Sequence, residues 1–140
     1  MKNENHLVGL SMVFSREDVK GMKVLVRTEK YAIARVRNPP RGCFAVVDDG
    51  KETSIVIDQS RVNEADALTI ERDLRIITFD AVLPFDLVGF LASVSNALAE
   101  VGVAVFVISA YSTDHLLIKE LDLDKALAKL REVGFEVVLE

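Results

Sequence analysis

Two short segments of the chain carry the residues best suited to bind a small molecule. The first contains Phe85, Asp86, Leu87, Val88 and Gly89, where an expected strand turns into an expected helix. Free backbone N–H groups at a helix N-terminus suit a carboxylate, and a glycine there lets a ligand approach the backbone closely. The competing interpretation is that Gly89 relieves packing against a strand and that Asp86 caps the helix.

The second segment is a polar connection between two expected strands, and it contains Ser109, Tyr111, Thr113 and Asp114. These side chains are rich in hydrogen-bond donors and acceptors. Local turn chemistry is the competing explanation, and it is strong for Thr113. It is weaker for Asp114, because a carboxylate is uncommon in a strand. If both segments contact one ligand, Asp86 and Asp114 favour an amine-bearing or cationic molecule.

Other kinds of chemistry find little support in the sequence. His6 and His115 lack the spacing of metal ligands, and Cys43 has no histidine motif near it. Residues 48–50 are typical of a turn. They do not indicate a calcium loop, because the other ligand positions of such a loop are missing. The chain has no nucleophile elbow, phosphate-binding loop or dinucleotide fingerprint. We therefore expect no catalytic residues, no metal and no cofactor, and an enzyme is the least favoured class.

The elements that would position both segments are clearest after residue 74. Residues 74–79 are rich in strand-forming types, and the apolar spacing over 85–101 predicts an amphipathic helix. Gly102 follows at the position of a helix C-terminal glycine. Residues 103–109 are almost wholly apolar, which predicts a strand buried on both faces.

The rest of this half completes a recognisable order of elements. Residues 114–119 should pair back with the preceding strand, and Asp122 can cap a second helix. Gly134 ends that helix, and 135–139 form the last strand. Strand, helix, strand, strand, helix, strand is the order of a ferredoxin-like unit, in which a strand-to-helix loop and a polar hairpin can line a ligand cleft.

The first half of the chain offers strands but little helix, with expected strands at 23–27, 31–37, 43–47 and 54–57. Residues 58–66 are polar enough to be a linker. The predicted fold is therefore α+β, with two ferredoxin-like βαββαβ subdomains. The first, over residues 1–66, is degenerate and strand-rich, and the second covers 67–140.

Composition narrows the class of protein. Of 140 residues, 50% are hydrophobic and 28% are charged, so the chain can bury a core. The net charge is −5 and the chain has no basic stripe, which argues against nucleic-acid binding. No apolar run is long enough for a membrane span, and no signal peptide is visible. A single cysteine agrees with a reducing compartment, so we expect a cytoplasmic protein.

Over 85–93 and 108–114 the chain resembles the ACT domain family. It is most similar to small tandem ACT proteins related to the amino-acid-sensing modules of aspartate kinases and to cytosolic arginine sensors. The second half aligns throughout, whereas in the first half the resemblance rests on 31–36 and 52–56. ACT domains are regulatory folds that bind amino acids, commonly where two domains meet.

The resemblance implies a regulatory protein that binds an amino acid or related metabolite without catalysis. The implied ligand-binding residues are those of the two segments: Phe85, Asp86, Leu87, Val88, Gly89, Ser109, Tyr111, Thr113 and Asp114. The implied partners are a second copy of the chain, as a homodimer, or a regulated enzyme. The alternative is a protein–protein interaction module whose ligand cleft is unoccupied.

Overall fold

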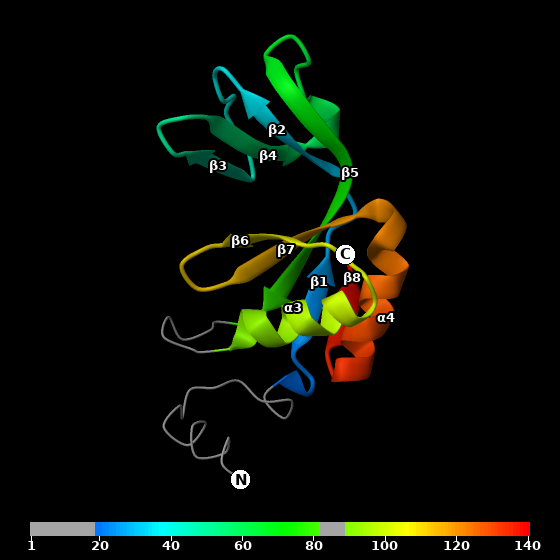
Figure 1. The fold of residues 1–140 in the computed structure, drawn as a ribbon. Helices are drawn as coiled ribbons and strands as arrows, with labels where there is room; N and C mark the ends of the chain where they lie inside the picture. Colours follow the sequence, from blue (N-terminus) through cyan, green and yellow to red (C-terminus); the bar gives the residue numbers. More distant parts are fainter. Residues whose placement is uncertain (1–18, 82–88) are drawn as a thin grey trace.

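The computed structural model describes residues 19–81 and 89–140, which form an α+β fold with β-strands and two α-helices (Figure 1). In chain order the elements are β1 (Lys23–Val26), β2 (Tyr31–Val36), β3 (Ala45–Asp48), β4 (Thr53–Asp58), the 3-10 helix η1 (Gln59–Arg61), β5 (Ala67–Asp80), α3 (Phe90–Glu100), β6 (Phe106–Ser109), β7 (Asp114–Lys119), the 3-10 helix η2 (Glu120–Asp122), α4 (Leu123–Val133) and β8 (Glu136–Leu139). From β5 to β8 this is the strand and helix order that the sequence predicts.

The long strand β5 belongs to two groups of strands, as Figure 1 shows. Its first part pairs with β2, and the strand order there is β3-β4-β2-β5; we call this the N-terminal sheet. Its last part pairs with β1 on one side and β7 on the other. With β8 beside β1 and β6 beside β7, this group is the C-terminal sheet.

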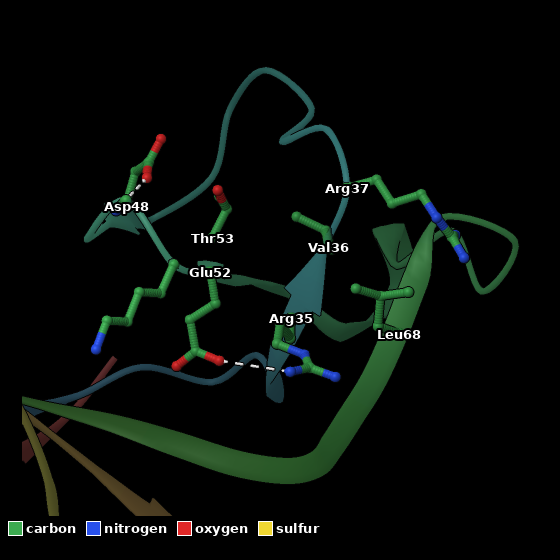
Figure 2. Close-up of a pocket in the computed structure, with 9 residues that line it drawn as sticks. Arg35, Val36, Arg37, Asp48, Glu52, Thr53 and Leu68 are labelled. Carbon is green, nitrogen blue, oxygen red and sulfur yellow. Dashed lines mark hydrogen bonds and ion pairs between the residues drawn. The ribbon is translucent and has the colours of Figure 1, made fainter.

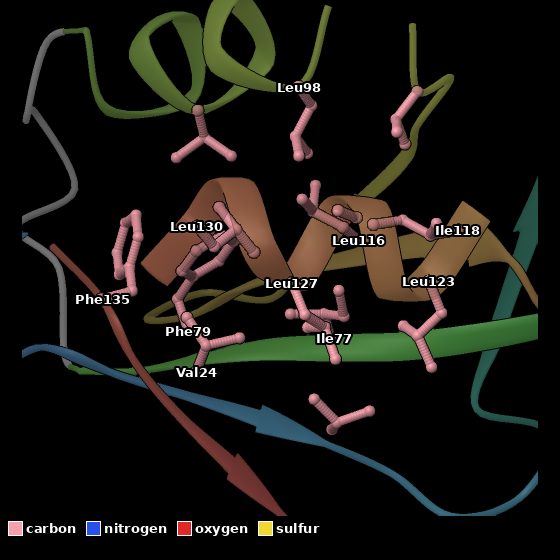
Figure 3. Close-up of a cluster of buried hydrophobic side chains, with 14 of the residues drawn as sticks. Val24, Ile77, Phe79, Leu98, Leu116, Ile118, Leu123, Leu127, Leu130 and Phe135 are labelled. Atoms are coloured by element: carbon pink, nitrogen blue, oxygen red, sulfur yellow. The ribbon is translucent and has the colours of Figure 1, made fainter. Parts of the chain in front are cut away.

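Helices α3 and α4 cover one face of the C-terminal sheet (Figure 1). Side chains alternate along a strand, so Ile77 and Phe79 of β5 face the helices. The ring of Phe79 is fully buried and contacts Phe90 and Phe135 at centroid distances of 5.0 and 5.3 Å. Figure 3 shows this cluster between the helices and the strands. It is the main core of the protein.

The other face of the C-terminal sheet is covered by the N-terminal sheet. Ile76 of β5 and Leu117 of β7 project from this face of the C-terminal sheet and pack with Tyr31 and Val56 of the N-terminal sheet. All four side chains are at most 7% exposed. The first part of the chain therefore covers the face that the helices leave open, which burial of apolar surface favours.

The predicted strand at 103–109 is wrong in length and in environment. The strand β6 begins only at Phe106, and among the described strands it pairs with β7 alone, at the edge of the C-terminal sheet. Phe106 is 46% exposed and Val107 is 39% exposed. Only Val103 of the preceding apolar run is deeply buried, because it packs into the helix-side core outside any strand. Apolar composition alone does not separate a central strand from an apolar edge.

The structure confirms the two predicted helix-ending glycines but not the predicted capping role of Asp122. Gly102 and Gly134 both follow helices with positive φ angles of 75° and 129°, as a helix-ending glycine should. Asp122 precedes α4 but its side chain accepts no capping hydrogen bond. The reason is that η2 runs directly into α4, so Asp122 has a helical backbone conformation and its carboxylate lies 3.7 Å from the Lys125 ammonium instead.

Candidate functional site

The predicted polar segment forms the turn between β6 and β7, at one end of the C-terminal sheet. The register pairs Thr78 with His115, so the end of β5 lies beside the turn that joins β6 and β7. Ser109 and Asp114 face each other across this hairpin, and the Ser109 hydroxyl donates a hydrogen bond of 2.7 Å to the Asp114 carboxylate. The turn closes with a hydrogen bond of 2.8 Å from the Ala110 N–H to the Thr113 carbonyl.

Strand alternation places the Ser109–Asp114 pair on the helix-bearing face of the sheet. Leu116 packs in the helix-side core, whereas Leu117 packs against the N-terminal sheet. Asp114 is two residues from Leu116 and therefore shares its face, and Ser109 shares the face of its partner. The pair thus lies on the face that α3 covers.

Gly89 stands at the N-terminus of α3 with a φ angle of 93°. This left-handed conformation suits glycine, because a side chain would be strained there. The residue offers no capping side chain, and its carbonyl accepts the hydrogen bond of 2.9 Å from the Ser93 N–H that starts the helix. A ligand carboxylate at this end would meet helix N–H groups that Gly89 does not cap.

Five of the nine predicted ligand-binding residues are described: Gly89, Ser109, Tyr111, Thr113 and Asp114. Ser109, Thr113 and Asp114 meet at the hairpin, while the Tyr111 side chain projects from the turn and is 83% exposed. Phe85, Asp86, Leu87 and Val88 lie outside the described residues, so their contribution and the capping role of Asp86 stay predictions.

The residue after Asp114 takes part in a contact that the sequence does not reveal. His115 points to the opposite face, where its ring meets the Phe44 ring at 5.0 Å and 90° and its Nδ1 is hydrogen-bonded to Thr78 Oγ1 at 2.8 Å. The Arg27 guanidinium lies 4.9 Å from the centre of the Phe44 ring and donates to the Tyr31 hydroxyl at 3.2 Å. This cluster ties the N-terminal sheet to the strand that carries Asp114.

The pKa of His115 is lowered from its usual value, first by burial and then by the nearby positive charge of Arg27, while Asp114 acts in the opposite direction. A neutral imidazole therefore suits the folded state best. Between its folded and unfolded pKa values the unfolded chain binds more protons, so stability falls as the pH drops.

We expect the wild-type protein to lose stability as the pH falls below about 6.5, where an unfolded histidine becomes charged. In the variant His115→Gln this part of the pH dependence should be flatter, although the variant is less stable at every pH because it loses the Phe44 contact. Urea unfolding followed at several pH values measures both slopes. Parallel curves for the two proteins would contradict the role given to His115.

Metal and thiol chemistry gain no support in the part of the chain that the structure describes. Within residues 19–81 and 89–140 no three His, Cys, Asp or Glu side chains are grouped to hold a metal ion. Cys43 donates to the Pro40 carbonyl at 3.3 Å, and burial raises the pKa of its thiol. A thiol of raised pKa is a poor nucleophile. No helix in these described ranges is long and apolar enough to cross a membrane.

The chain is similar to a known domain family and to solved structures of other proteins. Residues 69–132 match the family model described as ACT domain, a range that contains Gly89 and the whole β6–β7 hairpin. A crystal structure of a protein from Agobacterium tumefaciens is 27% identical with a TM-score of 0.75, and the match covers 86% of this chain and 94% of that chain. No curated protein sequence matches the chain.

More distant structures share the fold. A Vibrio cholerae protein of unknown function, described as a possible transport protein, is 20% identical with a TM-score of 0.68, over 83% of this chain and 92% of that chain. A putative C-terminal regulatory domain of aspartate kinase from Porphyromonas gingivalis is 19% identical with a TM-score of 0.56, over 81% and 96%. The α+β fold of a sheet and two helices is thus ACT-like.

Proposed function

We propose that the chain is a regulatory module that binds an amino acid, or a related amine-bearing metabolite, where the β6–β7 hairpin meets the start of α3. The ACT match over residues 69–132 supports this function, since ACT domains are regulatory small-molecule binding domains. The likeness to a regulatory domain of aspartate kinase points the same way.

The observation that carries the proposal is the Ser109–Asp114 pair on the helix-bearing face. Asp114 is half-buried, and its Oδ1 accepts the Ser109 hydroxyl at 2.7 Å. Among the described residues nothing neutralises this carboxylate with a salt bridge. A positioned carboxylate without a cationic partner suits a ligand ammonium group, and charge-assisted hydrogen bonds are the stronger kind.

The remaining groups fit the other end of an amino acid. The backbone N–H groups at the start of α3, next to Gly89, would donate hydrogen bonds to the ligand carboxylate. Thr113 and Tyr111 would contact the ligand from the turn, and the segment 85–88 would complete the site. Asp86 adds a second acidic group, so cationic amino acids are the first candidates.

The wider arrangement is part of the same proposal. The chain would consist of two ferredoxin-like ACT-type subdomains in tandem, a degenerate one over residues 1–66 and a C-terminal one over 67–140, with β1 of the first inserted between β5 and β8 of the second. It would act in the cytoplasm and without catalysis. Ligand binding would change its contact with a second copy of the chain or with a regulated enzyme.

A thermal-shift screen of the standard amino acids tests the function. At least one of them should raise the melting temperature, because a ligand at about 100 times its dissociation constant stabilises the folded state by about 2.7 kcal/mol. Calorimetric titration of the best candidate confirms direct binding. No shift with any amino acid, together with no heat of binding, would reject amino-acid binding.

A second function, contact with another protein chain, is favoured by apolar residues at two sheet edges. Val46 and Val47 of the edge strand β3 are 48% and 59% exposed, and Phe106 and Val107 of the edge strand β6 are 46% and 39% exposed. β6 has no charged residue and β3 has only Asp48 at its end, and edge strands with so few charges are open to pairing with another chain. A homodimer formed through these edges agrees with either function.

If the edges pair two copies, the wild-type protein should elute at about twice its chain mass of 15.5 kDa. Replacing Phe106 by lysine should shift the protein to the monomer, because a charged side chain on an edge strand disfavours pairing with a strand of another chain. Leu121→Lys is the control, since Leu121 is 83% exposed in η2 and belongs to neither edge. Light scattering on a sizing column gives the masses, and a wild-type monomer at all micromolar concentrations would contradict the dimer.

A further inference from the structure

We propose a second ligand-binding site, in a groove of the N-terminal sheet, for a small molecule that combines an anionic group with a short aliphatic part. The groove lies between the end of β2, the β3–β4 hairpin and the beginning of β5, and its volume is about 280 Å³ (Figure 2). None of its lining residues belongs to the ligand site at Gly89 and the β6–β7 hairpin. It is therefore a separate site.

Three basic side chains line the groove, and two of them lack a partner among the residues that the structure describes. Arg35 lies 3.6 Å from the Glu52 carboxylate. The side chains of Arg37 and Lys51 make no ion pair or hydrogen bond within the described part of the chain. Neighbouring basic residues differ in this respect, since Arg61 donates to two backbone carbonyls and Arg72 pairs with Glu64.

The acidic residues of the groove are already engaged. Glu52 pairs with Arg35, and one carboxylate oxygen of Asp48 accepts the Gly50 N–H at 2.9 Å. The donors of Arg37 and Lys51 therefore remain for an incoming anion, and a guanidinium can bind a carboxylate or phosphate through two parallel hydrogen bonds.

Two apolar side chains, Val36 and Leu68, are among the residues that line the groove. Val36 is 6% exposed, and Leu68 is 43% exposed although charged residues surround it. The register between β2 and β5 shifts here, since Arg35 pairs with Thr69 and Val36 with Ala67, so that Leu68 is left without a partner. Such a bulge re-aims a side chain and often accompanies a binding site. An exposed leucine beside the Arg37 guanidinium, in a groove that Lys51 lines from the β3–β4 hairpin, suits an anion with an aliphatic group (Figure 2).

The size and charge of the groove restrict the ligand. Its volume of about 280 Å³ is near the lower end for small-molecule pockets, which span about 300–1,000 Å³. Asp48 and Glu52 among the cations would repel a long polyanion such as nucleic acid. Short-chain carboxylates and alkyl phosphates share the required chemistry.

Amide chemical shifts of the full chain test the site with three probes of one shape: isovalerate, isopentyl phosphate and neutral isovaleramide. Both anions or one of them should shift the amides of Arg37, Lys51 and Leu68, and the neutral amide should not. Tighter binding of isopentyl phosphate would identify a phosphate ligand, and tighter binding of isovalerate a carboxylate.

Variants separate this site from general attraction to basic residues. Arg37→Gln should weaken binding of the anion about tenfold, as expected for one charged hydrogen-bonding partner. Arg41→Gln is the matched control, because Arg41 is exposed and lies outside the groove. Equal loss in both variants, equal binding of isovaleramide, or no shift with either anion at millimolar concentration would overturn the proposal.

Discussion

Replacing Phe79 by alanine is expected to lower the free energy of unfolding by about 3–5 kcal/mol, the largest effect of any substitution considered for this protein. Phe79 is fully buried between the helices and the C-terminal sheet, and its ring contacts the rings of Phe90 and Phe135. The substitution removes apolar contacts and leaves a cavity that the surrounding strands cannot fill. Urea unfolding at neutral pH measures the change.

Leu121→Ala is the control for this substitution. Leu121 is also apolar but is 83% exposed, so its removal should change stability by less than about 0.5 kcal/mol. A loss below about 1 kcal/mol for Phe79→Ala would contradict the core as described, because a buried aromatic residue cannot be removed at so small a cost.

The second large effect is expected at the ligand site. Asp114→Ala should weaken binding of the amino acid that stabilises the protein most by about 1.5–3 kcal/mol, or about 10- to 150-fold. The variant removes the carboxylate that accepts the ligand ammonium in our proposal. The core should persist, because the Asp114 side chain is partly exposed and, within the described residues, is hydrogen-bonded only to the Ser109 hydroxyl at the surface. Calorimetric titration measures the affinity.

Asp124→Ala provides the matched control. Asp124 is also acidic, is exposed and lies in the first turn of α4, away from the hairpin. The Asp124→Ala variant loses the same charge as Asp114→Ala, so any general electrostatic effect on a cationic ligand appears in both variants. If Asp114→Ala and Asp124→Ala bind equally well, Asp114 has only the role of a turn residue.

The second half of the fold could be predicted because its signals are local. Apolar residues at helical spacing mark α3 and α4, and Gly102 and Gly134 mark their ends with positive φ angles. The alternation along β7 similarly separates Leu116 from Leu117. Each of these signals depends on residues within a few positions of one another.

The placement of β1 could not be predicted in this way. It lies between β5 and β8 in the C-terminal sheet, although it is the first strand described in the chain. Its partners are remote in sequence, and the period of a strand says nothing about which strand it pairs with. The same limit hides the length of β5, whose polar residues Glu71, Arg72 and Asp73 interrupt its apolar pattern.

The candidate site was predictable only in part. The polar hairpin was visible as an unusual run of side chains, and the structure brings Ser109 and Asp114 together there. The contact of His115 with Phe44 was not visible, because it joins residues from the two sheets and depends on how they pack. Likewise, the groove beside Leu68 arises from a bulge, which sequence alone does not mark.

The most direct test of the central proposal is to map the bound amino acid by amide chemical shifts in the full chain. The proposal predicts that the largest changes fall on Gly89 and on residues 109–114. Binding that is measurable by calorimetry but leaves Gly89 and residues 109–114 unperturbed would contradict the proposed site.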